Sequence, residues 1–167
     1  MNIIDDKNLI PDKSIIEKVI NVHPLCKNLS SRIKNLTIEI SMDPSEKINF
    51  DIATQKAVLF VFKDTILKPE YEFVLFHEFS HVADKLNPEF KYSDEKYDRL
   101  TTKEVAAVRT LWDCYIDSRL NRKHLVPASY AKTNRMGRVD YLESCGVNNA
   151  VHYLMKSGII QIVLCLS

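Results

Sequence analysis

The chain has 167 residues, a net charge of +1, 46% apolar residues and 27% charged residues. This length can bury the core of one globular domain, and the mixed charges give neither a basic surface for nucleic acid nor a membrane-binding surface. These features exclude the disordered and fibrous classes, and we expect a single domain over residues 1–167 with no nucleic-acid or membrane partner.

The first part of the chain predicts helices followed by strands. Apolar residues at helical spacing in "SIIEKVINV" predict a helix that begins at residue 14, and a second short helix is expected within 24–34. Alternating apolar residues predict strands at 37–41, 47–52 and 57–62, separated by turn residues. These strands predict a small, mainly antiparallel sheet.

Two long helices are predicted after the strands. Pro69 suits the first position of one helix, and Asn87-Pro88 ends it. A polar loop follows. Thr101 and Glu104 have the spacing of a capping box, which predicts the start of the second helix, and that helix is expected to continue to Pro127. Beyond it, short helices are expected at 138–144 and 148–156.

The segment His77-Glu78-Phe79-Ser80-His81 lies inside the first long helix. Because a helix advances about 100° per residue, His81 falls about 40° from His77 and both imidazoles share one face, within reach of one ion. Glu78 leans to the side, where it can reach a water on that ion. H-E-x-x-H on a helix is typical of two zinc ligands and a general base. The alternative is an exposed His-Glu-His edge, but the apolar neighbours favour a central helix whose histidines need partners.

A catalytic zinc usually has three protein ligands and a water, so a third ligand is expected elsewhere. Asp113 and Asp117 lie one turn apart on the same face of the second long helix, whereas Glu104 lies on the opposite side and belongs to the capping box. Asp is unfavourable in the middle of a helix, which favours a functional role. The alternative is a solvated helix edge in which the aspartates pair with Arg109.

The H-E-x-x-H motif from His77 to His81, followed by a helix with Asp113-x-x-x-Asp117, resembles the gluzincin zinc metallopeptidases. The resemblance covers roughly residues 37–120 and implies a compact α+β, zincin-like fold, with a small antiparallel sheet on the active-site helix and a mostly helical C-terminal part. In gluzincins the second helix has E-x-x-x-D. By this resemblance Asp113 is the third zinc ligand and Asp117 hydrogen-bonds His77. Because Asp stands where the family has Glu, Asp117 is the alternative ligand.

The resemblance implies a zinc-dependent metallopeptidase with Zn²⁺ as its cofactor and a peptide or protein as its substrate. Glu78 is then the catalytic base that takes a proton from the zinc-bound water and passes it to the leaving amine. The alternatives are a zinc hydrolase of a non-peptide amide, a non-catalytic zinc-stabilised binding protein, and a helical interaction module without metal. Candidate donors to the oxyanion are Arg109, Tyr130, Tyr141, His152 and Tyr153.

The cysteines and the opening residues indicate a cytoplasmic protein. No two of the four cysteines have C-x-x-C spacing, so we expect reduced thiols. The opening "MNIIDDKNLI" lacks the basic and then apolar stretches of a signal peptide. His23, which precedes a proline, is interpreted as a loop residue.

Overall fold

The computed structural model describes residues 1–128 and divides the chain into two compact units, Met1–Leu86 and Asn87–Ser167. Helices and a small sheet are both present, so the predicted α+β class is confirmed. The expectation of a single domain stays a prediction. None of the helices within residues 1–128 is both long and apolar enough to cross a bilayer.

The first unit contains a four-stranded sheet with the order β1-β2-β4-β3. β1 pairs with β2 and β2 pairs with β4 in parallel, and only β3 and β4 form an antiparallel pair. The prediction of a mainly antiparallel sheet is therefore wrong. Alternation of apolar residues locates a strand but does not select its neighbour, and β1 is too short for its pattern to be recognised. The strands are β1 (Asn2–Ile4), β2 (Asn35–Ile40), β3 (Lys47–Asp51) and β4 (Lys56–Val61).

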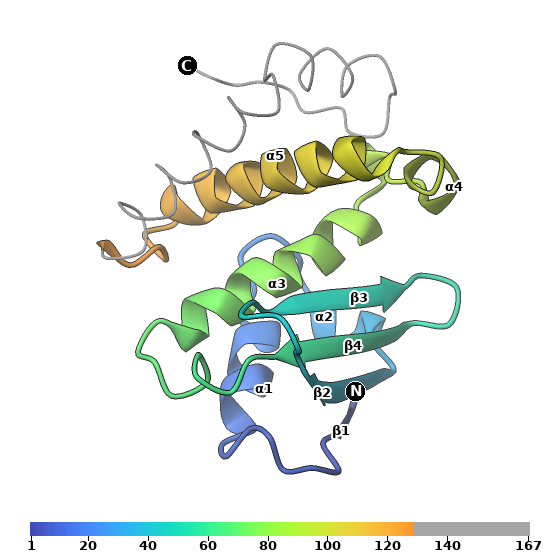
Figure 1. Ribbon diagram of the computed structural model, residues 1–167. Coiled ribbons are helices and arrows are strands. Elements are labelled where there is room, and N and C mark those ends of the chain that lie inside the picture. The colour runs from blue at the N-terminus through green and yellow to red at the C-terminus, as the bar shows by residue number, and fades with distance from the viewer. Residues whose placement is uncertain (129–167) are drawn as a thin grey trace. The chain divides into compact units, whose positions relative to one another are not determined.

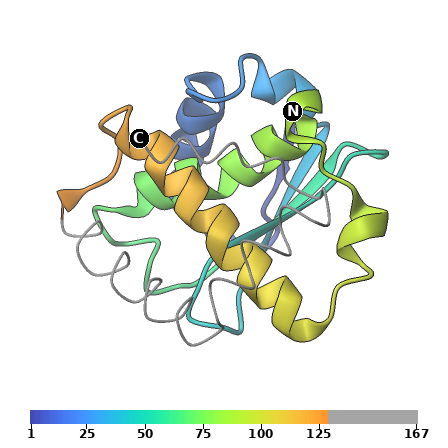
Figure 2. The same cartoon turned by 90° about the horizontal axis from the view of Figure 1, so that it is seen from above.

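One face of this sheet is covered by helices and the other is more exposed. Leu36 and Ile38 of β2 and Leu59 of β4 are buried, whereas the residues that alternate with them are half-buried or exposed, as expected when successive side chains point to opposite faces. The helices α1, α2 and α3 lie on the same side of the sheet (Figures 1 and 2). Their bounds are α1 (Ser14–Asn21), α2 (Leu29–Arg32) and α3 (Tyr71–Leu86).

Polar side chains tie α3 to its neighbours within the first unit. Lys18 of α1 forms an ion pair with Glu72 of α3, with Nζ 2.8 Å from Oε1. Near the other end of α3, Lys85 donates from Nζ to the Phe50 carbonyl oxygen of β3 at 3.3 Å. Between these ends Leu75, Phe79 and Val82 are fully buried. α3 is thus held at both ends and packed along its length.

The predicted helix bounds of α3 are close to those observed. The helix begins at Tyr71 rather than at Pro69, because residues 65–68 form turns that lead into it. It ends at Leu86, directly before Asn87-Pro88, as predicted. Asn87 then caps the next short helix, with its side-chain oxygen accepting from Glu89 N at 3.0 Å.

In the second unit, the described part consists of helices. The predicted polar loop contains two of them, η1 and α4. Ser93 is the N-cap of α4 and accepts from Lys96 N at 3.3 Å, a local signal that the sequence already contained. The rings of Phe90 and Trp112 lie 5.2 Å apart between centroids and join η1 to α5. The helices are η1 (Pro88–Phe90), α4 (Asp94–Tyr97) and α5 (Thr102–Asn121).

The start of α5 confirms the predicted capping box. The Thr101 N–H donates to Glu104 Oε2 at 2.8 Å, and the Glu104 N–H donates to Thr101 Oγ1 at 3.4 Å. These bonds satisfy N–H groups of the first turn that have no helical partner. α5 ends at Asn121, earlier than the expected Pro127. The helices expected at 138–144 and 148–156 lie outside the described residues.

Candidate metal centre

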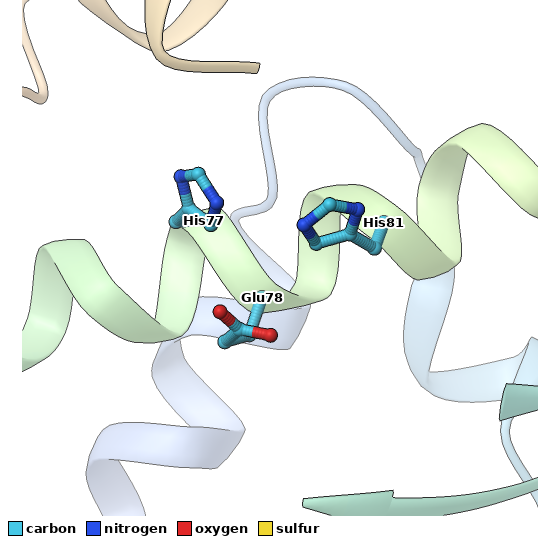
Figure 3. A group of neighbouring side chains, drawn as sticks. All are labelled: His77, Glu78 and His81. Carbon is cyan, nitrogen blue, oxygen red and sulfur yellow. The ribbon is translucent and has the colours of Figure 1, made fainter. Parts of the chain in front are cut away.

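α3 brings His77, Glu78 and His81 together. One ligand atom of each residue lies within 4.8 Å of the ligand atoms of the other two. The centroids of the two imidazole rings are 5.3 Å apart, and the rings are steeply inclined to each other. Figure 3 shows the rings next to each other along the helix, while the Glu78 carboxylate leaves the helix on a different side. This is the arrangement predicted from the helical spacing.

The spacing of the two rings fits a tetrahedral zinc ion. With Zn–N bonds of about 2.0–2.1 Å and a tetrahedral angle, two imidazoles on one zinc have ring centroids about 5 Å apart. The observed 5.3 Å between His77 and His81 is close to this value. The separation of the two rings is therefore compatible with both binding one ion. Nitrogen ligands from neutral imidazoles are also the donors that zinc prefers.

The site lies in a largely buried stretch of α3. His77 is 5% exposed and Glu78 is 8% exposed, whereas His81 is half-buried. The edge of the Phe73 ring packs against the His77 ring, with 6.3 Å between centroids. Ionisable side chains in such surroundings are stable only with suitable partners. The burial excludes the alternative of an exposed His-Glu-His edge.

The first residue of α3 is a buried tyrosine. Tyr71 begins α3, is 3% exposed, and its hydroxyl has no hydrogen-bond partner among the described residues. Burial, together with the negative charges of Glu46, Asp5 and Glu78, raises the pKa of this hydroxyl. Tyr71 therefore stays protonated and neutral over the whole physiological pH range, with its proton as a potential donor.

The predicted third ligand belongs to the second unit. Asp113 and Asp117 both lie on α5 and both are half-buried, and both have interaction partners. The alternative of a solvated helix edge stays open for these residues. Their pairing with the histidines of α3 stays a prediction.

The structure describes one of the candidate oxyanion donors. Arg109 donates from Nε to the Tyr97 hydroxyl at 2.9 Å, on the exposed surface of the second unit. The other four candidates, Tyr130, Tyr141, His152 and Tyr153, lie outside the described residues. The two cysteines that are described, Cys26 and Cys114, are free thiols.

Sequence reasoning missed one residue of this region, His23. It lies in a loop, as predicted, but its ring is buried against α3. Nothing in the residues around it signals this burial except the histidine itself, because the contact joins segments far apart in the chain.

Comparison with known proteins gives no family assignment. No family model matches the chain, and no curated protein and no solved structure matches it. The geometry of α3 is therefore the main observation that bears on function.

Proposed function

We propose that this protein is a zinc-dependent metallopeptidase. The single observation that supports the proposal is the group formed by His77, Glu78 and His81, in which two imidazoles at zinc-binding separation lie beside a carboxylate. A zinc site with only a structural role has no need of a carboxylate beside its ligands. A base in this position favours hydrolysis.

Each of the three side chains has one role in this proposal. His77 and His81 hold the ion through one ring nitrogen each, and Asp113, or alternatively Asp117, supplies the third ligand. When bound, zinc lowers the pKa of water towards neutrality and polarises the carbonyl of the substrate. Glu78 accepts a proton from the attacking water and donates it to the leaving amine.

Burial of Glu78 suits a residue that must accept and then return a proton. In water, a carboxylate is a weak base. Removal from water disfavours the charged carboxylate and makes it a stronger base. Glu78 is 8% exposed and therefore lies largely out of bulk water.

The test is a comparison of wild type with Glu78→Gln, which keeps the size of the side chain and removes the base. We expect wild type to bind one zinc per chain and to cleave peptides from a mixed peptide library in a chelator-sensitive way. Glu78→Gln is expected to keep the zinc and to lose cleavage by at least about 100-fold. Glu72→Gln changes a half-buried glutamate in the first turn of the same helix, outside the group of His77, Glu78 and His81; it is the matched control and should keep both properties.

Each other result has a defined meaning. Absence of stoichiometric zinc in wild type overturns the proposal. Loss of zinc in Glu78→Gln indicates that Glu78 is a ligand and contradicts its role as a base. Zinc binding with cleavage of simple N-acyl amides but not of peptides indicates a hydrolase of non-peptide amides. Zinc binding without hydrolysis of either class indicates a zinc-stabilised binding protein.

A further inference from the structure

His23 is a buried histidine outside the H-E-x-x-H motif, and it packs against the middle of α3. The residue is 5% exposed, and its ring lies 5.8 Å from the Phe76 ring between centroids. Its Nε2 is 3.2 Å from the Phe76 carbonyl oxygen and 3.5 Å from Ser80 Oγ. The Ser80 hydroxyl donates to the same carbonyl oxygen at 2.7 Å. We call these three groups the His23 network.

One tautomer of the His23 ring satisfies the two backbone groups next to it. The Leu25 N–H lies 3.4 Å from Nδ1 and can only donate, so Nδ1 is the acceptor. The Phe76 carbonyl can only accept, so Nε2 has the proton and donates it. A neutral imidazole with one donor and one acceptor satisfies both neighbours. No other side chain of similar size offers both groups on one rigid ring.

The His23 network acts on the two positions that directly precede the proposed zinc ligands. Phe76 precedes His77, and Ser80 precedes His81. The Phe76 carbonyl belongs to the peptide group that leads into His77, so its orientation fixes the direction in which the His77 side chain leaves the helix. The same carbonyl is the regular helical acceptor for the Ser80 N–H, and an added serine hydroxyl at this position bends a helix slightly.

Packing alone does not explain a polar network at this place. α1 already buries Ile16, Val19 and Ile20, and the pair of Lys18 and Glu72 joins α1 to α3 at the surface. Buried polar networks are costly when incomplete, but when complete they allow only one geometry. The His23 network therefore adds directional control to an interface that apolar contacts already hold.

We propose that His23 is a positioning residue of the metal centre, which holds the turn between His77 and His81 in the geometry that binds one ion. This inference depends on the proposed zinc site and adds a residue to it that neither touches the ion nor belongs to the motif. Groups that orient metal ligands typically change metal affinity by about 10–100-fold when removed.

The test measures zinc affinity by competition with a chromogenic chelator, and site geometry from the visible absorption of the cobalt(II)-substituted protein. His23→Leu, which fills the space without a donor, is expected to weaken zinc binding about tenfold and to change the cobalt spectrum. His23→Gln places an amide N–H where the ring Nε2–H lies and should restore most of both properties. Ser80→Ala should show a smaller effect of the same kind.

A stability control separates positioning from folding. Val19→Ala removes buried methyl groups from α1 without touching the network, so it lowers thermal stability but should leave the cobalt spectrum and the zinc affinity of the folded protein unchanged. Equal zinc affinity and equal spectra in wild type and His23→Leu overturn this inference alone. Absence of zinc in wild type instead overturns the proposed function.

Discussion

The two long helices, α3 and α5, present ionisable residues in different ways. In α3 the three residues that could hold a metal ion lie within little more than one turn, and His77 and Glu78 are both buried. In α5 the two aspartates are half-buried and also one turn apart, and both have interaction partners. A local group can be interpreted from one helix, whereas a ligand from a second segment must be tested by experiment.

The largest loss of zinc affinity is expected from a substitution in α3. His81→Ala removes a nitrogen ligand, and we expect zinc affinity to fall by at least about 100-fold, since zinc binding free energy is shared among few ligands. Zinc content after dialysis against a weak chelator measures the loss. A matched change, His124→Ala, alters an exposed histidine of the second unit and should leave one zinc per chain. Equal zinc content in both variants would contradict the role of His81.

The second-largest loss of zinc is expected from a substitution in α5, and it distinguishes the two aspartates of that helix. Asp113→Ala is expected to lose most of its zinc, because a catalytic site keeps three protein ligands. Asp117→Asn is expected to weaken zinc binding only about tenfold, the effect of losing a partner that orients a ligand. The same dialysis experiment measures both. The reverse order of the two losses makes Asp117 the ligand, and full zinc in both variants removes α5 from the site.

Removal of the metal should affect the stability of the whole chain. An ion present at 100 times its dissociation constant stabilises the folded state by about 2.7 kcal/mol, which corresponds to roughly 5–10 °C in the melting temperature of a protein of this size. Thermal unfolding with zinc and with excess EDTA measures the shift.

Hydrogen exchange compares the two helices in the same experiment. If α5 supplies a ligand, amides of both α3 and α5 exchange faster after chelation. Faster exchange in α3 alone contradicts a ligand from α5.

The smallest effect concerns the capping box of α5. Hydrogen bonds from Thr101 lower the pKa of the Glu104 carboxyl, so the ionised form stabilises the folded state. This stabilisation is complete above the unfolded pKa of Glu104, near 4.5, and is lost as the pH falls through the lower folded value. Thr101→Ala should slightly lower the urea midpoint at pH 7 and reduce its fall between pH 5 and 3. An unchanged pH dependence would contradict this assignment.

Local patterns predicted most of the elements. The spacing of apolar residues located α1, β2, β3, β4 and α3 to within a few residues, because helices and strands bury one side at a fixed period; for α5 only the start was located this closely. The capping box at Thr101 and the helix end at Asn87-Pro88 are also local, since each depends on hydrogen bonds or steric limits within one turn. The short elements β1, η1 and α4 were missed because they are too short to show a period.

The sequence by itself determined the content of the candidate site in α3, because a helix that contains His77, Glu78 and His81 necessarily places both imidazoles within reach of one ion. Only the tertiary structure decided that the sheet pairs β1, β2 and β4 in parallel and that His23 packs behind the site. Strand order and buried contacts join residues that are distant in the chain, and the free energy that selects them comes from packing of the whole unit. Periodicity and motif spacing describe neighbouring residues in the chain, so they do not report how distant segments pack together.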